Sequence, residues 1–475
     1  MKKEEDYFKF IRNIRDSISS DIISEISPTY LSEPRGLYRN KSLHIIKPRS
    51  TKEVSDCLKL ATKHKICVVP WSGGTGLVGG QIALDQYHVT LSLERMNKIN
   101  NFSVVNQSIE VEAGVILQSI HEFVGTKNFF FPLSMASKGS CRIGGNLATN
   151  AGGVGVLKYG NARDLCLGLE VVLADGSIIN DIKTLKKDNT GYDLKNLFIG
   201  SEGSLGIITR AVLRLFPTPQ SRIVTFFGVP NFKSALESYM QISKRFGQYL
   251  QAFELISDEG LKFLEETNMD QSVAQKNKSP WYVLMELGFN SNSVEQDVYD
   301  VLDDLYNRNI ILDVISGDTE AKARKLWKIR EDIPEANKQI GAISSHDISV
   351  PLENMESFIN KSLNEIKKIN RFLRVNCFGH MGDGNLHFNI FPPQKETNSS
   401  YMDLKPKLIE IINTNCKSLE GSFSAEHGVG RLKVKDLKQY CDPGKFYVMR
   451  QIKKAIDPLS LLNPGVILRQ DTQDT

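Results

Sequence analysis

Histidine and cysteine are scarce in this chain of 475 residues, which contains eight histidines and seven cysteines. The cysteines are odd in number and include no CxxC pair, so neither a disulfide framework nor a zinc ribbon is expected. No apolar stretch approaches the ~20 residues of a membrane span, and the N-terminal MKKEEDYFKF lacks the apolar core of a secretory signal. These absences favour a protein without a membrane span, in the cytoplasm or in a matrix-like compartment, and they leave contact with a membrane surface open.

The net charge of the chain is also small. Lys and Arg number 59 against 55 Asp and Glu, which leaves +4 and gives no support to nucleic acid as a partner. Hydrophobic residues at 41% and charged residues at 24% are ordinary for a globular protein. At ~150 residues per domain the length predicts three units or two large ones.

The pattern along the chain changes near residue 220. Residues 50–63 are expected to form a helix with capping-box spacing, and a strand KICVVP follows them. The segment LRLFPTPQ (213–220) ends a strand with two prolines and is expected to be a domain boundary. Beyond it, helical stretches at 234–246 and 294–308 alternate with a strand at 279–288. This alternation predicts an α+β domain, an antiparallel sheet with helices on one face.

A glycine motif invites a dinucleotide-binding interpretation. Gly74, Gly76 and Gly79 have G-x-G-x-x-G spacing, and Glu94 follows at a suitable distance. That fingerprint requires a helix after the glycines, but the sequence beyond Gly80 has the character of a strand. A Rossmann NAD site is therefore disfavoured, and an ordinary glycine hairpin stays an alternative for this segment alone.

Glycine is concentrated in two further segments, at 139–155 and 200–209. Backbone without side chains can approach a ligand closely, and its N–H groups can cradle phosphate oxygens. Three such segments between strands favour one large flat or phosphorylated ligand over three separate turns.

The motifs PWSGGTGLVGG, FPLSMASKGSCRIGGNLATNAGG and IGSEGSLGIIT closely resemble the vanillyl-alcohol-oxidase-type, or PCMH-type, FAD-binding domain. More narrowly, the chain from about residue 30 to 467 resembles the FAD-linked D-2-hydroxyacid dehydrogenases: D-2-hydroxyglutarate dehydrogenase, D-lactate dehydrogenase and the flavin subunit of glycolate oxidase. The resemblance implies an α+β fold with a PCMH-type FAD-binding domain of two α+β subdomains and an antiparallel-sheet substrate, or cap, domain.

The same resemblance implies the domain bounds and the cofactor site. The expected divisions are an FAD-binding domain at 1–220, a substrate domain carrying a metal hairpin at 221–420, and a helical segment at 421–475 that returns to the FAD domain. Residues 65–80 contain no histidine for covalent attachment, so FAD is expected to be non-covalent. The residues implied in FAD binding are Pro70, Ser72, Gly73, Gly74, Thr75, Gly76, Leu77, Pro132, Gly139, Ser140, Gly144, Gly145, Asn146, Asn150, Ile207, Ile208 and Asn463.

Three of the eight histidines fall between residues 380 and 427. Taken alone, HMGDGNLH is consistent with two histidines that flank a hairpin turn and bind nothing. Positions on either side of a turn can also face each other, which suits two imidazole ligands, and SAEHGVG offers a carboxylate. Two histidines and one carboxylate are typical of catalytic divalent-metal sites.

The resemblance implies that these residues form a metal site. It implies His380, His387 and Glu426 as metal ligands and His427 as the base. Zinc is the leading metal, with manganese and iron as alternatives.

The resemblance also implies a reaction and its substrate groups. A D-2-hydroxy acid would bind the metal, lose its hydroxyl proton to His427 and pass its C2 hydride to FAD. Arg330 is implied as a catalytic, substrate-binding residue that holds the carboxylate, and Asn389 as a further substrate-binding residue. Electrons would pass to a quinone, a cytochrome or an electron-transfer flavoprotein instead of NAD, and a homodimer stays open.

The chain departs from the hydroxyglutarate enzymes at two positions. Pro334 stands where a threonine is expected, and Ser345 where a lysine would bind a second carboxylate. This weakens 2-hydroxyglutarate and favours D-lactate or another D-2-hydroxy acid. His346 is interpreted as a satisfied core histidine in preference to a substrate contact. The alternatives are a glycolate-oxidase-type flavin subunit, an electron-transfer subunit without its own turnover, and a non-redox flavin transferase.

Overall fold

The computed structural model describes residues 2–269, 278–290 and 294–469. The chain forms two compact units, and each is described by itself. The first unit consists of Met1–Gly152, Gly160–Thr218 and Glu426–Thr475; the second consists of Gly153–Tyr159 and Pro219–Ala425.

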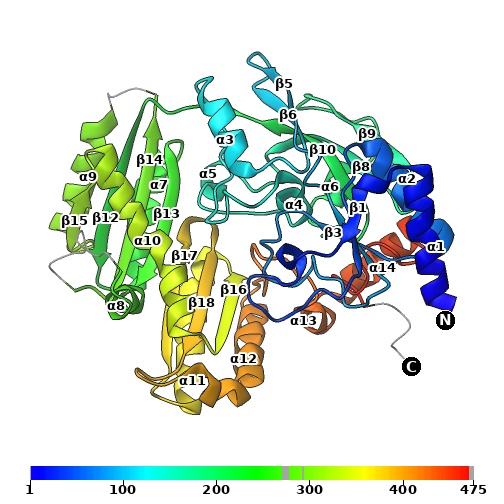
Figure 1. The fold of residues 1–475 in the computed structure, drawn as a ribbon. Helices are drawn as coiled ribbons and strands as arrows, with labels where there is room; N and C mark the ends of the chain where they lie inside the picture. Colours follow the sequence, from blue (N-terminus) through cyan, green and yellow to red (C-terminus); the bar gives the residue numbers. More distant parts are fainter. Residues whose placement is uncertain (1, 270–277, 291–293, 470–475) are drawn as a thin grey trace. The chain divides into compact units, whose positions relative to one another are not determined.

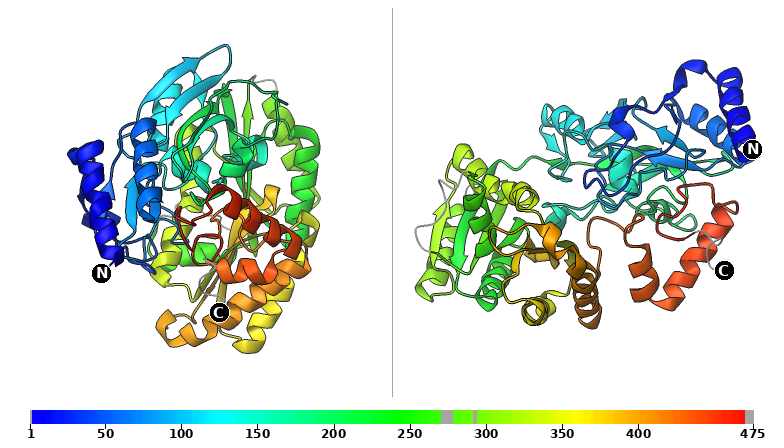
Figure 2. Two further views of the ribbon diagram at one scale, coloured as in Figure 1. Left: turned by 90° about the vertical axis from the view of Figure 1, so that its right-hand side faces the viewer. Right: turned by 60° about the horizontal axis from the view of Figure 1, so that its bottom comes forward.

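The first unit contains a four-stranded sheet in the order β1-β2-β4-β3. β2 and β3 each pair with β4 in parallel, and α2 connects them. The predicted helix at 50–63 is confirmed as α2, because Ser50 caps it by accepting a hydrogen bond from the Glu53 N–H at 3.2 Å. Helix α1 packs beside α2 (Figures 1 and 2). These elements are α1 (Lys2–Ser17), α2 (Thr51–His64), β1 (Ile23–Glu25), β2 (His44–Ile46), β3 (Val68–Trp71) and β4 (Val89–Ser92).

A second sheet of this unit has five antiparallel strands in the order β5-β6-β10-β8-β9. Arg210 of β10 forms ion pairs with Glu110 of β6 and Glu170 of β8, at 2.8 and 2.6 Å. The strands are β5 (Ile99–Ser103), β6 (Ser108–Glu112), β8 (Cys166–Val172), β9 (Ile178–Asp181) and β10 (Ile207–Arg214). The remaining elements of this part are α3 (Leu117–Gly125), α4 (Ile143–Ala148), α6 (Lys195–Phe198) and the pair β7 (Phe129–Phe130) and β11 (Phe216–Pro217).

The C-terminal segment belongs to the first unit. Its helices are α13 (Val434–Tyr440) and α14 (Pro443–Ile456). After them the chain runs beside β3, where the Val68 N–H donates to the carbonyl of Leu461 and the Val68 carbonyl accepts from the Asn463 N–H. The last described residues are thereby attached to the first sheet.

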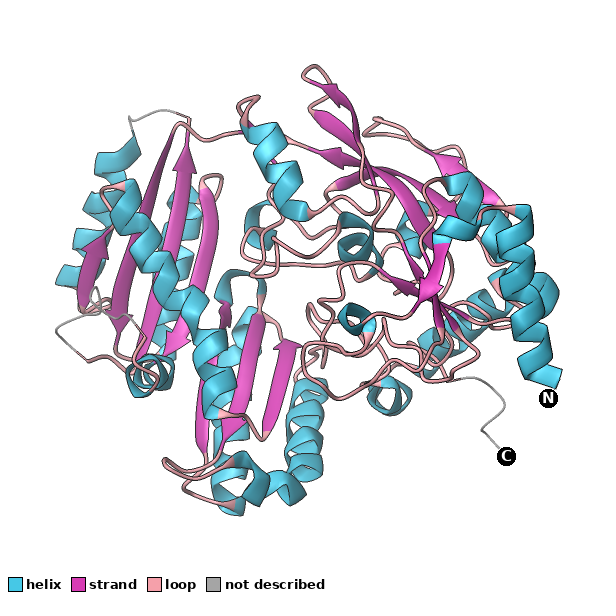
Figure 3. Ribbon diagram, in the orientation of Figure 1, coloured by secondary structure: helices cyan, strands magenta, loops and turns pink. Residues whose placement is uncertain are grey.

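The second unit is built on one antiparallel sheet of seven strands, in the order β15-β12-β14-β13-β17-β18-β16 (Figures 1 and 3). Every pairing in it is antiparallel. The strands are β12 (Ser221–Val229), β13 (Leu250–Ser257), β14 (Trp281–Phe289), β15 (Asp313–Ser316), β16 (Ser344–Ser349), β17 (Arg374–His380) and β18 (Asn385–Phe391).

Helices cover both faces of this sheet, so the expectation of helices on one face is wrong. The strands are apolar on both sides: in β14, Val283 and Met285 belong to one core, and Tyr282 and Leu284 to the other. Because alternate side chains point to opposite faces, each face needs its own cover. One core includes α7 (Phe232–Phe246), α9 (Glu295–Asn307), α11 (Met355–Ile369) and α12 (Lys405–Ser418); the other includes α8 (Asp258–Glu266) and α10 (Glu320–Ile340).

The predicted hairpin is confirmed as β17 and β18. A short 3-10 turn over Met381–Asp383 joins the strands, and Gly384 closes the turn with φ +83°. Glycine is needed there because a Cβ at Gly384 would also lie 2.4 Å from the carbonyl of Val350. The turn places His380 at the end of one strand and His387 in the next.

Candidate functional site

The three glycine-rich segments of the first unit meet around Pro70 and Gly73. A Cβ at Gly73 would lie 2.4 Å from the carbonyl oxygen of Ser140, and one at Gly203 would lie 2.4 Å from Cγ of Pro70. The Gly145 N–H donates to Oγ of Ser72 at 3.0 Å. Glycine is required because larger residues would push the segments apart.

Backbone N–H groups in the first glycine loop are available to a ligand. In the described part of the chain, no hydrogen bond is made by the N–H groups of residues 73–77. Residues 72–80 contain no helix, in agreement with the argument against a Rossmann site. A run of such N–H groups forms a concave anion site, which fits the pyrophosphate of FAD.

A cavity of the first unit is lined by parts of all three segments. Two buried amide oxygens in its lining, Oδ1 of Asn146 and Oδ1 of Asn463, accept no hydrogen bond within the described chain. Both could accept from a flavin, so the lining fits the cofactor. The predicted cofactor residues in the lining are Pro70, Ser72, Gly73, Gly74, Thr75, Gly76, Gly144, Gly145, Asn146, Ile207, Ile208 and Asn463.

Five predicted cofactor residues are outside that lining. Asn150 instead accepts a hydrogen bond at Oδ1 from the Arg163 N–H, at 3.0 Å. Ser140 and Gly139 are exposed, and Pro132 is buried. Leu77 contributes the last of the first-loop N–H groups that make no hydrogen bond in the described chain.

His427 lines the same cavity, and Glu202 holds its loop. Both carboxylate oxygens of Glu202 accept backbone hydrogen bonds, from Val429 at 2.7 Å and from Gly430 at 2.8 Å. Burial raises the pKa of Glu202 to about 7, although the two N–H groups act to lower it. The segment after His427 is therefore fixed at the cavity by a carboxylate that titrates near neutral pH.

In the second unit, His380 and His387 face each other across the hairpin. Their ring centroids are 5.6 Å apart, and each offers a ligand nitrogen within 4.8 Å of the other's. His387 also packs on the ring of Phe378 with 5.0 Å between centroids. The spacing allows both imidazoles to bind one ion.

Each of these histidines has a buried carboxylate beside it. Oε1 of Glu254 lies 2.6 Å from Nδ1 of His380, and Oδ1 of Asp347 lies 3.8 Å from Nδ1 of His387. Carboxylates behind metal-binding histidines fix the ring orientation and tautomer. The chemistry of the donor set fits a divalent ion that accepts nitrogen and oxygen ligands.

Glu254 also contacts Arg330, the predicted substrate arginine. Arg330 Nε donates to Oε2 of Glu254 at 2.9 Å, and the guanidinium lies over Phe378 at 4.6 Å. Burial raises the pKa of Glu254, but the charges of His380 and Arg330 outweigh it and lower that pKa to about 2. Arg330 is thereby held through Nε, and no described residue occupies its donors at Nη1 and Nη2, which can bind an anion.

The other predicted residues of this unit lie on β16 and β18. Asn389 is buried and directly opposite Ser345, which is exposed. His346 points to the other face of the sheet, opposite Phe388, and its Nε2 lies 2.6 Å from Oγ of Ser344. This geometry agrees with the interpretation of His346 as a core histidine.

Glu426 and His427 are the first residues of the last segment of the first unit. The residue before them, Ala425, donates its N–H to the carbonyl of Asp347 at 3.3 Å. Asp347 is in turn the register partner of His387. The chain therefore leaves the second unit beside the histidine pair.

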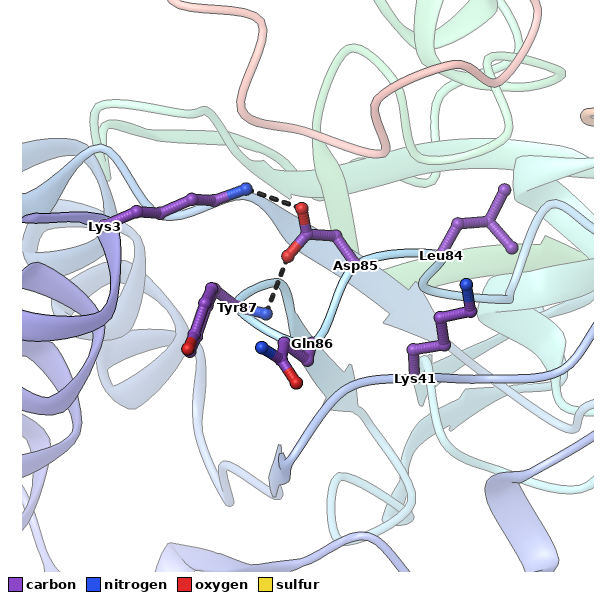
Figure 4. Close-up of a pocket in the computed structure, with 6 residues that line it drawn as sticks. All are labelled: Lys3, Lys41, Leu84, Asp85, Gln86 and Tyr87. Atoms are coloured by element: carbon purple, nitrogen blue, oxygen red, sulfur yellow. Dashed lines mark hydrogen bonds and ion pairs between the residues drawn. The ribbon is translucent and has the colours of Figure 1, made fainter. Parts of the chain in front are cut away.

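A second hollow on the first unit carries no comparable chemistry (Figure 4). Its acid, Asp85, pairs with Lys3 at 2.6 Å and accepts the Tyr87 N–H at 2.8 Å. The lining has neither histidine nor cysteine. Separately, among the described residues no helix is long and apolar enough to cross a membrane.

Sequence reasoning missed the carboxylates Glu202, Glu254 and Asp347. A signal was present for Glu254, because it is a single charged residue inside the apolar strand sequence LQAFELIS. Burying an unpaired charge is costly, so such a residue indicates a buried partner. Nothing in the strand itself identifies that partner.

Comparison with protein families gives two matches. Residues 42–181 match the FAD binding domain model, and residues 218–467 match the model of the C-terminal domain of FAD linked oxidases. The expected cytoplasmic location stays a prediction, since several relatives are named as mitochondrial.

Curated relatives cover nearly the whole chain. A Bos taurus D-2-hydroxyglutarate dehydrogenase is 37% identical over 432 residues, 90% of this chain and 77% of the relative. A Schizosaccharomyces pombe protein, provisionally named a D-lactate dehydrogenase, is 36% identical over 90% of this chain and 82% of its own. A Saccharomyces cerevisiae D-2-hydroxyglutarate–pyruvate transhydrogenase is 32% identical over 96% and 92%.

Solved structures share the fold at low identity. p-Cresol methylhydroxylase matches with a TM-score of 0.75 and 15% identity, over 98% of both chains. An alkyldihydroxyacetonephosphate synthase matches with a TM-score of 0.72 and 18% identity, over 96% of this chain and 85% of its own. The predicted fold class, a PCMH-type FAD-binding domain with a sheet-rich second domain, is confirmed.

Proposed function

Because this chain belongs to the FAD-linked oxidases, alongside D-2-hydroxyglutarate and D-lactate dehydrogenases, we propose that it oxidises a D-2-hydroxy acid to the 2-oxo acid with FAD and a divalent metal. As a member of that family it is an FAD-dependent oxidoreductase acting on a CH–OH group. We propose in addition its substrate, its metal and the roles of its individual residues.

One observation carries the proposal: His380 and His387 face each other, and the ring of His380 is hydrogen-bonded to the buried carboxylate of Glu254. A histidine pair without a ligand would have no need of this arrangement. We assign Glu426 as the third ligand, because the residue before it is hydrogen-bonded to Asp347, the register partner of His387. A divalent ion held by these groups would act as a Lewis acid that lowers the pKa of the substrate hydroxyl.

The chain's own residues then have separate tasks. Arg330 binds the substrate carboxylate through Nη1 and Nη2, a fork geometry suited to two parallel hydrogen bonds. His427 takes the proton of the hydroxyl group, and Glu202 holds the loop that carries this base at the cavity. FAD, held by the glycine segments, supplies the acceptor for the hydride from C2.

The substrate is expected to carry a single carboxylate. Ser345 is exposed and directly opposite Asn389, the proposed substrate contact. A short neutral hydroxyl at this position offers no cation to a second carboxylate. D-Lactate or another D-2-hydroxy monocarboxylate is therefore favoured over D-2-hydroxyglutarate.

The test is anaerobic mixing of the FAD-loaded protein with a panel of D- and L-2-hydroxy acids while flavin absorbance is followed. D acids are expected to bleach the flavin, with D-lactate faster than D-2-hydroxyglutarate, and a chelator is expected to abolish the reaction. If no D acid bleaches the flavin with Zn²⁺ or Mn²⁺ present, the proposed function is wrong. Bleaching that survives complete metal removal would refute the metal's role alone.

A further inference from the structure

Glu254 has contacts that go beyond holding one histidine. It lies in β13 and is the register partner of His380 in β17, 126 positions away in sequence. Its side chain is 1% exposed, and its two oxygens have different partners: Oε1 meets Nδ1 of His380 and Oε2 accepts from Nε of Arg330. One carboxylate therefore contacts a proposed metal ligand and the proposed substrate arginine.

The chemistry of a carboxylate fixes both partners. An ionised carboxylate only accepts hydrogen bonds, so Nδ1 of His380 carries the proton and Nε2 carries the lone pair. The Arg330 guanidinium is planar, so fixing Nε also sets the direction of its outer nitrogens. A shift of Glu254 would thus turn the imidazole and the guanidinium together.

Stability alone does not account for this arrangement. Apolar side chains, among them Ile256 and Phe378, pack on the same face of the sheet. Buried ion pairs in such surroundings are often no better for stability than apolar residues of similar volume. What a carboxylate adds at this position is direction, because its two oxygens define fixed angles to both partners.

We propose that Glu254 is a positioning residue that couples metal binding to substrate binding, by orienting His380 for the ion and Arg330 for the substrate carboxylate. This inference rests on the proposed function. It predicts that a change at the Glu254 carboxylate weakens both metal binding by His380 and carboxylate binding by Arg330, although these two side chains bind different groups.

The decisive variant is Glu254→Gln. Its amide has one acceptor oxygen, so either His380 or Arg330 would face an NH₂ group instead. The metal-stripped, FAD-loaded enzyme is titrated with Zn²⁺ alone, and the KM of the best D-2-hydroxy acid is measured at saturating Zn²⁺. We expect Zn²⁺ affinity to fall by ~10- to 100-fold and KM to rise.

Glu286→Gln is the matched control. Glu286 is a carboxylate on the neighbouring strand β14, and it accepts from Nε1 of Trp327 in α10, the helix that also carries Arg330. It contacts neither histidine of the pair in the described structure. We expect this variant to keep the wild-type Zn²⁺ affinity and KM, because it perturbs the helix without touching the proposed coupling.

The outcomes separate the two proposals. Wild-type protein that binds no Zn²⁺ and bleaches with no D acid overturns the proposed function itself. If the wild-type protein binds Zn²⁺ and is bleached by a D acid, but Glu254→Gln has the same Zn²⁺ affinity as the wild type, only the positioning role is overturned. If Glu254→Gln does not fold, Glu254→Asp takes its place: its shorter side chain cannot keep both contacts, and unchanged Zn²⁺ affinity and KM in that variant would equally refute the inference.

Discussion

Replacing Glu202 by glutamine should remove a specific part of the pH dependence of stability in the flavin-free protein. Glu202 is buried and accepts N–H groups from Val429 and Gly430, and burial raises its pKa from 4.5 to about 7. In the unfolded chain the same carboxyl would titrate near its ordinary value. The folded protein therefore holds a proton at Glu202 over a pH range in which the unfolded chain has already lost it.

The sign and size follow from linkage. Because the folded state binds the extra proton, Glu202 contributes stability below about pH 4.5, and this contribution is lost as the pH rises to about 7. At 1.36 kcal/mol per pKa unit, the loss is roughly 3 kcal/mol. Domains of about 150–250 residues, a little smaller than the first unit, lose about 2–4 °C in Tm per kcal/mol, so the expected decrease is about 6–12 °C.

The assay is the Tm of wild type and Glu202→Gln at a series of pH values between 4.5 and 8. Contributions from the other titrating groups are common to both proteins, so they cancel when one curve of Tm against pH is subtracted from the other. Glu33→Gln is a matched control, since Glu33 is also buried and accepts backbone N–H groups in the first unit. Wild type should lose stability relative to Glu202→Gln as the pH rises, and parallel curves for these two proteins would refute the reasoning.

Three further results are expected. Gly73→Ala should weaken FAD binding, because its Cβ would lie 2.4 Å from the Ser140 carbonyl; fluorescence titration should show no such loss for Gly125→Ala, whose Cβ meets nothing within 4 Å. His427→Ala should slow anaerobic flavin bleaching by ~10²-fold or more, and an unchanged rate would reject it as the base. Ser345→Lys should raise kcat/KM for D-2-hydroxyglutarate relative to D-lactate by about tenfold, the equivalent of ~1.4 kcal/mol for one added charged contact. An unchanged ratio would show that Ser345 does not determine which substrate is preferred.

Parts of the fold that depend on local signals were predictable. Ser50 and Glu53 have the spacing of a helix start, and they form that cap in α2. Asp383-Gly384 is a turn signal between two apolar strands, and the chain turns there. In both cases the residues that decide the structure are within four positions of each other, so no knowledge of the remaining fold is needed.

Contacts between distant segments were not predictable in the same way. Glu254 and His380 meet because β13 pairs with β17, and that register depends on which apolar faces find each other across the sheet. The short helix α5 (Val156–Tyr159) lies in the second unit, although the glycine segment before it lies in the first unit as far as Gly152. The helices on both sheet faces follow from the same long-range packing.

The two buried glutamates show why burial alone does not set the state of a carboxyl group. Glu202 has neutral N–H partners, so burial dominates and its pKa rises to about 7. Glu254 is as deeply buried, but a guanidinium and an imidazole contact its two oxygens, and its pKa falls to about 2. A carboxylate that stays ionised through the working pH range can hold His380 and Arg330 at constant geometry. Glu202 titrates near neutrality, so the strength with which it holds the loop after His427 changes with pH. The positioning of the metal ligand should therefore be insensitive to pH where the positioning of the base is not.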